Sequence, residues 1–152
     1  MKQGEKAPDF TLPDQQGTPR SLYQLLEQGP VVLFFYPIAS SSGCTAEACH
    51  FRDLGGEFTE LGAQRVGIST DSVSRQQKFA TAHTFDYPLL ADEDGQVADL
   101  FGVRRRLLGK LAPVKRVTFV IDTDAVVLAA LSSETKMSSH ADRALDVLRA
   151  RP

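Results

Sequence analysis

The chain contains two cysteines, Cys44 and Cys49, and their type and spacing make them the first candidates for chemistry. A thiolate is a strong nucleophile, and two neighbouring thiols can form a disulfide when one of them is oxidised. The two cysteines lie five residues apart, which differs from the Cys-x-x-Cys pattern of dithiol oxidoreductases. If these two thiols react with each other, they are therefore a redox pair of another type than the Cys-x-x-Cys pair.

The residues that follow Gly43 have the periodicity of an α-helix. Their apolar members recur every three or four positions, at Ala48, Phe51, Leu54, Phe58 and Leu61. With about 100° of rotation per residue, Cys44 lies on or beside this apolar stripe in the first turn, whereas Cys49 lies almost opposite it. The unpaired N–H groups and the positive end of the helix dipole at the first turn favour a thiolate. The pattern therefore predicts that Cys44 is the more reactive thiol.

The same helix keeps the two thiols apart. Two Cα atoms five residues apart on an ideal helix are separated by about 8.6 Å, and a disulfide requires less than about 7 Å. A disulfide therefore requires the first turns of the helix to unwind. We expect unwinding from about Gly43 to His50, ending near Phe51, because Gly55 and Gly56 weaken the helix whereas a buried Phe51 anchors its later turns.

Two other interpretations of the cysteines stay open on spacing alone. Free cysteine is commonly a small buried residue, and this interpretation suits Cys44 better than Cys49, which lies off the apolar stripe. A zinc site would need further ligands from His50, His83 and His140, and no pair of these has the clustered spacing of zinc ligands.

The composition is that of a soluble globular domain and excludes several classes of protein. The chain has 152 residues, of which 42% are hydrophobic and 24% charged, and we expect residues 1–152 to form a single domain. A net charge of −2 offers no basic surface for nucleic acid or for a membrane. The longest apolar run, Val31 to Tyr36, has six residues, which is too short for a transmembrane helix.

The first residues lead to an expectation about location. Met1 to Lys6 is followed by Pro8 and Asp9 rather than by an apolar segment, which argues against a signal peptide. We therefore expect a cytoplasmic protein. In the cytoplasm a disulfide is more often catalytic or redox-sensing than structural.

The order of the predicted elements indicates the fold class. The N-terminal half is predicted to contain a hairpin (10–12 and 18–21), a short helix (22–26), a buried strand (31–36), the cysteine helix, a strand (65–69) and a helix capped by Asp71 or Ser72. The C-terminal half is predicted to contain a short helix near Val97, a hairpin (117–121 and 126–131) and a last helix capped by Ser138 or Ser139. This order favours an α/β, thioredoxin-like sandwich with a mixed central sheet flanked by helices, plus the N-terminal β-hairpin.

The segment around the cysteines resembles the active-site segment of a peroxiredoxin. Pro37, Ser41 and Cys44 match the family pattern of Pro, three residues, Thr or Ser, two residues and Cys. A second cysteine five residues later is most similar to the peroxiredoxin Q group, also called bacterioferritin comigratory proteins. The similarity extends over almost the whole chain, through Ala7–Phe10, Gly67–Ser69, Phe85–Leu90, Phe101–Val103 and Arg116–Asp122.

The resemblance implies a peroxidase that uses no cofactor and no metal. Cys44 would attack the peroxide and become a sulfenic acid, and Cys49 would condense with it to an intrachain disulfide that a thioredoxin-like or other dithiol protein reduces. Pro37 would shield the site, the Ser41 hydroxyl would contact peroxide and thiolate, and Arg116 would fix the substrate and favour the thiolate. Members of this group are often monomers, and a resolving cysteine in the same chain removes the need for a partner subunit.

The chain departs from the family pattern at two positions. Ser41 replaces the usual Thr and lacks the methyl group that helps to fix the rotamer, and Ser42 stands where the group commonly has Pro. Without the resemblance, Arg116 would be interpreted as a solvated charge beside a strand. An alternative function is a redox-responsive binding protein on a thioredoxin-like scaffold, which would need both cysteines but neither Ser41 nor Arg116.

Overall fold

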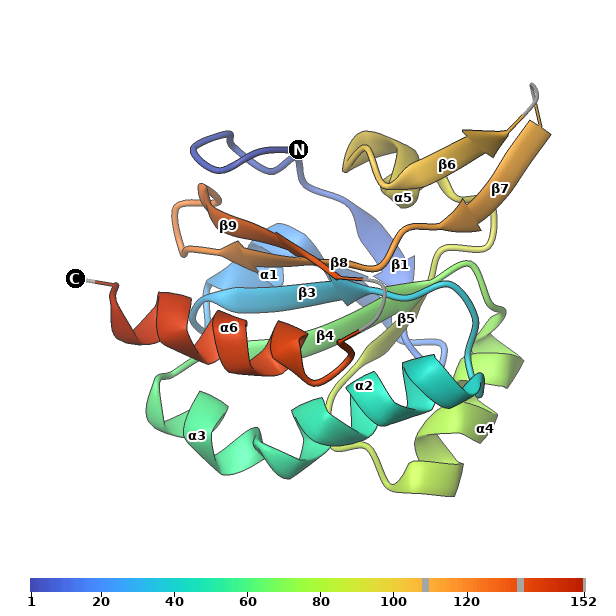
Figure 1. Cartoon of the computed structure of the whole chain (residues 1–152), viewed down its shortest axis with the longest axis horizontal. Helices are drawn as coiled ribbons and strands as arrows, with labels where there is room; N and C mark the ends of the chain where they lie inside the picture. Colours follow the sequence, from blue (N-terminus) through green and yellow to red (C-terminus); the bar gives the residue numbers. More distant parts are fainter. Residues whose placement is uncertain (108–109, 134–135, 152) are drawn as a thin grey trace.

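The computed structural model describes residues 1–107, 110–133 and 136–151, with the backbone alone for 105–107 and 110–113 (Figure 1). The helices are α1 (Leu22–Leu26), α2 (Ser42–Asp53), α3 (Gly55–Glu60), α4 (Val73–His83), α5 (Gln96–Leu100) and α6 (Ser139–Arg149). The strands are β1 (Thr11–Pro13), β2 (Pro19–Ser21), β3 (Val31–Phe35), β4 (Gln64–Ser69), β5 (Leu89–Ala91), β6 (Arg104–Leu107), β7 (Lys110–Val114), β8 (Val117–Ile121) and β9 (Val127–Ser132).

Strand β3 is the centre of a mixed sheet with the order β5-β4-β3-β8-β9 (Figure 1). Strands β5, β4 and β3 run parallel, whereas β8 pairs antiparallel with both β3 and β9. Every residue of β3 is buried, as its continuous apolar sequence predicts for a strand covered on both faces. The predicted α/β sandwich with a mixed sheet is therefore confirmed, and so is the N-terminal hairpin, which β1 and β2 form.

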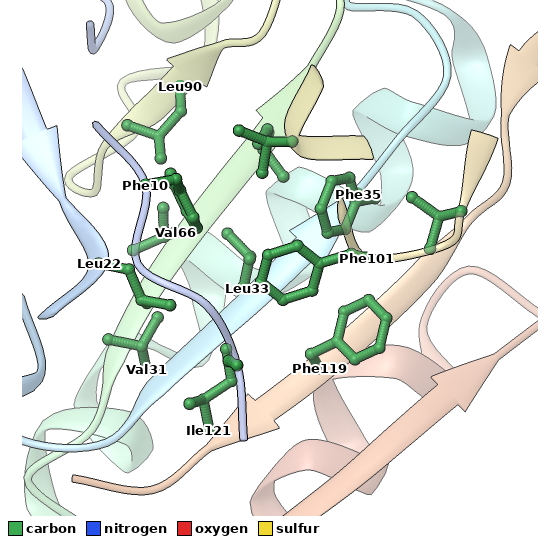
Figure 2. Close-up of a cluster of buried hydrophobic side chains, with 14 of the residues drawn as sticks. Phe10, Leu22, Val31, Leu33, Phe35, Val66, Leu90, Phe101, Phe119 and Ile121 are labelled. Atoms are coloured by element: carbon green, nitrogen blue, oxygen red, sulfur yellow. The ribbon is translucent and has the colours of Figure 1, made fainter. Parts of the chain in front are cut away.

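Successive side chains of β3 point to opposite faces of the sheet, so the molecule has two apolar layers. The odd-numbered residues of β3 pack with α1, α5 and the N-terminal segment in the cluster that Figure 2 shows. The even-numbered residues pack with α2, α3, α4 and α6 on the other face. On that face the ring of Phe34 stacks on Phe51 of α2 with 4.2 Å between centroids. The helix that carries both cysteines therefore rests on the central strand.

The apolar stripe that begins at Ala48 predicts one helix as far as Leu61, and this prediction is wrong in its second half. The helix is interrupted at Leu54, which has φ −91° and ψ 13°, and continues as α3. Two glycines follow the interruption, and the guanidinium of Arg65 lies so close to Gly55 that a Cβ there would be 3.0 Å from Nη1. Nη1 of Arg65 also donates to the carbonyl of Phe51 at 3.0 Å. The low helix propensity of glycine and this buried cation together end α2.

The hairpin of β6 and β7 was not predicted from the sequence. Its first strand contains Arg104, Arg105 and Arg106, so it lacks the apolar alternation by which a half-buried strand is recognised. Residues 108–109 between the two strands lie outside the described residues.

The predicted helix caps are confirmed at one helix and only in part at another. Ser72 caps α4, because its hydroxyl accepts a hydrogen bond from the Arg75 N–H at 3.2 Å. Ser138 occupies the N-cap position of α6 but makes no side-chain capping hydrogen bond. Its backbone is already helical, with φ −70° and ψ −21°, and not extended as such a cap requires. Ser139 instead donates its hydroxyl proton to the Lys136 carbonyl at 2.7 Å.

Arg65 joins the end of α2 to the segment that precedes β5. Its side chain is 8% exposed and makes two hydrogen bonds of 3.0 Å to the carboxylate of Asp86. The same guanidinium lies 4.9 Å above the centroid of the Tyr87 ring. The hydrogen bonds from Arg65 hold the pKa of Asp86 below its ordinary value. The Asp86 carboxylate therefore stabilises the arginine that anchors Phe51.

Replacing Asp86 by asparagine tests this anchor. Because the folded-state pKa is lowered, the ionised carboxylate stabilises the folded chain above the ordinary carboxyl pKa of about 3.9, and this contribution is lost as the pH falls through the lower folded value. We expect Asp86→Asn to lower the free energy of unfolding at neutral pH by about 1 kcal/mol, because solvent screens the exposed side of the pair. We also expect a shallower loss of stability in acid, which urea unfolding at a series of pH values measures.

Asp53→Asn is the matched control for this prediction. Asp53 has the same exposed side-chain fraction as Asp86, 62%, but its partner Arg52 is 35% exposed, compared with 8% for Arg65. Surface pairs contribute little to stability. Equal losses of stability in the two variants would contradict the role of Asp86 as a partner of a buried cation.

Candidate active site

Cys44 lies in the first turn of α2, as its sequence position predicts. The loop after β3 leads to Ser41, the N-cap residue, whose hydroxyl oxygen accepts a hydrogen bond from the Cys44 N–H at 3.4 Å. The Cys44 side chain is 1% exposed. Because the first N–H groups of a helix have no intrahelical acceptor, the sulfur lies near the partial positive charge at the N-terminus of α2.

Arg116 lies immediately before β8, and its guanidinium reaches the sulfur of Cys44. Nη2 donates to Sγ at 3.3 Å, and Nη1 donates to Oε1 of Glu47 at 3.0 Å. Burial alone would lower the pKa of Arg116, but the charge of Glu47 and the hydrogen bond to Cys44 raise it above its usual value. The side chain is 6% exposed, so the interpretation of Arg116 as a solvated charge is wrong. The structure brings Cys44, Ser41 and Arg116 together.

Glu47 and His140 complete a buried polar cluster that was not predicted from the sequence. Glu47 lies three residues after Cys44, so both side chains share one face of α2, and Glu47 is fully buried. Nδ1 of His140 lies 3.6 Å from Oε2 of Glu47 and 2.8 Å from the Thr118 hydroxyl. Because a carbonyl oxygen only accepts, Nε2 of His140 donates to Ser133 O at 2.8 Å. The spacing of Cys44 and Glu47 was the one available signal, and nothing in the sequence links either residue to His140.

The loop from Pro37 to Ser41 has a strained backbone and is partly buried. Ser40 adopts a left-handed conformation with φ 68°, which is unusual for a residue with a Cβ. Ser41 donates its hydroxyl proton to the carbonyl of Ile38 at 3.1 Å while it accepts from Cys44. Pro37, which opens the loop, is partly buried. The Ser41 hydroxyl is therefore held by the loop itself, without the methyl group of a threonine.

A second network of buried polar side chains, which was also not predicted from the sequence, connects this loop to β4 and α4. The carboxylate of Asp71 accepts hydrogen bonds of 2.7 Å from the Ala39 N–H and from the Ser69 hydroxyl. Gln76 donates to Ser69 at 3.0 Å and accepts from the Tyr36 hydroxyl at 2.5 Å. Asp71, Ser69, Gln76 and Tyr36 are all buried. The loop therefore has a fixed position relative to β4 and α4.

Cys49 lies on the same helix as Cys44 and is partly buried, and both thiols are free. Since α2 is continuous from Ser42 to Asp53, the two cysteines lie beyond the reach of a disulfide in this conformation. Any bond between them requires the backbone from residue 44 to residue 49 to change.

The three histidines of the zinc interpretation have other neighbours. His50 lies 2.8 Å from a carboxylate oxygen of Asp142, and the ring of His83 packs edge-on against Phe79. Within residues 1–107, 110–133 and 136–151, no three side chains of the metal-binding types gather in a group that could hold an ion. In the part of the chain that the structure describes, no helix is both long and apolar enough to cross a membrane.

The amino-acid sequence is similar to those of known proteins over nearly its whole length. Residues 3–130 match the sequence model of the AhpC/TSA family. A protein of Mycobacterium tuberculosis named among the peroxiredoxins is 65% identical over 150 residues, which cover 99% of this chain and 97% of that protein. Peroxiredoxin Bcp of Escherichia coli is 37% identical over 152 residues, which cover 98% of this chain and 96% of that protein.

Solved structures show the same arrangement of elements. The crystal structure of peroxidoxin BcpB from Mycobacterium tuberculosis superposes with a TM-score of 0.96 at 64% identity, covering 100% of this chain and 99% of that chain. The bacterioferritin comigratory protein of Xanthomonas campestris, studied for its alkyl peroxide reduction activity, superposes with a TM-score of 0.84 at 31% identity, covering 93% of this chain and 90% of that chain. These superpositions confirm the thioredoxin-like fold class.

The contact between Arg116 and Cys44 leads to a prediction about the rate of peroxide attack. In a Cys49→Ser background, which has a single cysteine, we expect Arg116→Ala to slow the reaction with hydrogen peroxide by at least about tenfold, or about 1.4 kcal/mol. Arg116→Lys should restore only part of the rate, because an ammonium group lacks the planar fork that reaches both Sγ and the carboxylate. Stopped-flow peroxide consumption measures the effect in each variant.

Lys115→Ala is the control, because Lys115 is the neighbouring cation and its side chain is exposed. It should leave the peroxide rate unchanged. A loss of similar size in Lys115→Ala, or none in Arg116→Ala, would show that the Arg116 contact does not support the attack of Cys44 on peroxide.

Proposed function

The chain belongs to the AhpC/TSA family and, within it, to the peroxiredoxin Q and Bcp group, and on this basis we propose that it reduces hydrogen peroxide and organic hydroperoxides through Cys44. Family membership supports thiol peroxidase activity, which is an oxidoreductase activity. The observation that carries the assignment to Cys44 is the 3.3 Å hydrogen bond from Arg116 to its sulfur at the N-terminus of α2. The alkyl peroxide activity of the Xanthomonas campestris relative supports organic hydroperoxides as substrates.

In the first step, the Cys44 thiolate attacks one oxygen of the peroxide. The O–O bond breaks, the attacked oxygen stays on sulfur as a sulfenic acid, and the other oxygen leaves as hydroxide or alkoxide and takes up a proton. Negative charge moves from the sulfur to the leaving oxygen during this step. The guanidinium of Arg116 and the N–H groups at the start of α2 are fixed donors that can stabilise the charge in both positions. The Ser41 oxygen, whose own proton goes to the Ile38 carbonyl, would hold the peroxide next to the sulfur by accepting a hydrogen bond from it.

In the second step, the Cys49 thiolate attacks the sulfur of the Cys44 sulfenic acid, a disulfide forms, and the oxygen leaves as water after protonation. This step requires the early turns of α2 to unwind. The later turns are anchored by the stacking of Phe51 on Phe34, by Arg65 on the Phe51 carbonyl and by a 2.7 Å hydrogen bond from Arg52 to the His83 carbonyl. We propose that unwinding covers about residues 43–50 and ends at Phe51.

The disulfide is then returned to two thiols by an external dithiol protein of the thioredoxin type. Unwinding would expose Cys49 to such a partner, and a reducing compartment such as the cytoplasm would supply it. Because both cysteines lie in one chain, we propose that the enzyme acts as a monomer. We also propose that residues 1–152 form a single domain. No metal or cofactor takes part in either step.

The alternative function, a redox-responsive binding protein, is less well supported by the site. A switch would need Cys44 and Cys49 only, whereas the Arg116 guanidinium donates to the sulfur of Cys44 and the Ser41 hydroxyl caps the helix at the Cys44 N–H. Stopped-flow consumption of hydrogen peroxide by the reduced chain separates the two functions. We expect a second-order rate far above that of a free thiol. A rate equal to that of a free thiol would favour the binding function.

The roles of the two cysteines lead to opposite expectations for their variants. Cys44→Ser should abolish peroxide reduction, because the variant lacks the thiol at the helix N-terminus. Cys49→Ser should reduce one equivalent of peroxide and stop as a sulfenic acid, which a dimedone-type reagent traps and mass spectrometry detects. Activity in Cys44→Ser equal to that of the unaltered chain would reverse the assignment.

Partial unwinding of α2 on oxidation predicts a local change in amide hydrogen exchange. On oxidation, protection should fall from Thr45 to His50, because these amides lose their helical hydrogen bonds, and it should stay nearly constant in Val117–Ile121 at the centre of the sheet. Comparison of the reduced and disulfide forms by mass spectrometry measures this. Equal protection of Thr45–His50 in both forms would mean that the disulfide forms without unwinding.

A further inference from the structure

Tyr87 makes a hydrogen bond to the helix that must unwind. Its hydroxyl donates to the carbonyl of Ala48 at 2.6 Å, and both residues are buried. In an α-helix the carbonyl of residue 48 already accepts the N–H of residue 52, so the Tyr87 hydroxyl is a second donor that comes from outside α2. Burial raises the pKa of Tyr87 well above its ordinary value, so the hydroxyl keeps its proton.

The position of the acceptor gives this contact its importance. The carbonyl of Ala48 belongs to the peptide group that joins Ala48 to Cys49. Bringing Cys49 within disulfide distance of Cys44 moves or rotates this peptide, and the hydrogen bond from Tyr87 then breaks. Among the contacts of α2 described above, those of Arg116 hold the peroxidatic end and those of Arg65 hold the end that stays folded. The contact of Tyr87 falls between them.

We propose that Tyr87 is a positioning residue for the resolving cysteine: its hydroxyl holds the Ala48–Cys49 peptide in the helix and thereby sets the rate at which the Cys44 sulfenic acid becomes a disulfide. This inference rests on the proposed function, because it assumes that Cys49 resolves Cys44.

The Tyr87 hydroxyl can act in this way because its ring has a fixed position. The Arg65 guanidinium lies above the ring, and the ring of Phe85 stacks on it with 5.3 Å between centroids. The side chain of Gln15 donates to the Tyr87 carbonyl at 3.2 Å and accepts from the Leu89 N–H at 2.9 Å. The hydroxyl is therefore placed by contacts that do not include the unwinding segment.

The rate of resolution decides what happens to the sulfenic acid. While α2 stays folded, the sulfenate can react with a second peroxide, which transfers one oxygen to the sulfur, gives a sulfinate and releases water or an alcohol. Once α2 unwinds, the Cys49 thiolate attacks the Cys44 sulfur instead and forms the disulfide. A residue that slows unwinding therefore increases overoxidation at a given peroxide concentration.

Tyr87→Phe removes the hydroxyl and keeps the ring. In a single turnover with one equivalent of hydrogen peroxide, quenched with acid and analysed by mass spectrometry, we expect the disulfide to form about tenfold faster while peroxide consumption is unchanged. The peroxide concentration that converts half of Cys44 to sulfinic acid during turnover with dithiothreitol should rise by a similar factor. The reduction potential of the disulfide should become more negative, by about 30 mV for a tenfold shift in the equilibrium.

Tyr23→Phe is the matched control. Its hydroxyl also donates to a backbone carbonyl, that of Ala7 at 2.7 Å, but Tyr23 lies on α1, on the face of the sheet opposite to α2. This variant should match the unaltered chain in all three measurements. Each variant loses one hydrogen bond from a tyrosine hydroxyl to a backbone carbonyl, but only the bond of Tyr87 involves α2, so loss of a restraint on Cys49 changes Tyr87→Phe alone.

The outcomes separate this inference from the proposed function. If the unaltered chain forms the Cys44–Cys49 disulfide and Tyr87→Phe forms it no faster, the role of Tyr87 is wrong and the proposed function stands. If the unaltered chain forms no such disulfide, the proposed resolution step fails, and the role of Tyr87 fails with it.

A second measurement uses the unaltered chain and does not depend on the folding of a variant. The hydroxyl proton of Tyr87 should give a slowly exchanging NMR signal in the reduced form, and this signal should vanish in the disulfide form. A signal that persists in the disulfide form would overturn the inference.

Discussion

An intact α2 places the sulfur of Cys44 against Arg116, and the same helical geometry keeps Cys49 outside disulfide range. These two consequences of one helix conflict, because the first step of the proposed reaction needs the helix and the second step needs it unwound. The contacts that hold α2 differ between its early and its later turns. The early turns are held by the burial of Cys44 and Ala48 and by polar contacts of Arg116 and Tyr87. The later turns are held by the stacking of Phe51 on Phe34 and by Arg65 on the Phe51 carbonyl.

The sheet supplies the rigid frame for this arrangement. Strand β3 is buried on both faces, and its end leads into the loop that caps α2 with Ser41. Strand β8 begins directly after Arg116, and β4 ends at Ser69, which supports the loop through Asp71. Arg116 and the loop that caps α2 are therefore placed from the ends of three neighbouring strands of one sheet, and strand pairing sets the relative positions of those ends.

Much of the fold and of the candidate site could be predicted from the sequence, because short local patterns indicate them. The apolar run of β3, the helical periodicity after Gly43 and the spacing of Pro37, Ser41 and Cys44 are all visible within short segments. The contact of Glu47 with Arg116 joins residues 69 positions apart, and that of Ala39 with Asp71 joins residues 32 positions apart. Such pairs depend on the topology of the sheet, which no local pattern specifies. The helix break at Leu54 also depends on a distant residue, the guanidinium of Arg65, and the glycines alone suggested only a weak helix.

Stopped-flow circular dichroism during a single turnover tests the central claim, that α2 is folded when peroxide reacts and unwinds when the disulfide forms. The account predicts that the helical signal stays constant while the peroxide is consumed and then falls at the rate at which the disulfide appears. In Cys49→Ser, which stops at the sulfenic acid, the helical signal should stay constant throughout. A disulfide that forms with no loss of helical signal would contradict the account.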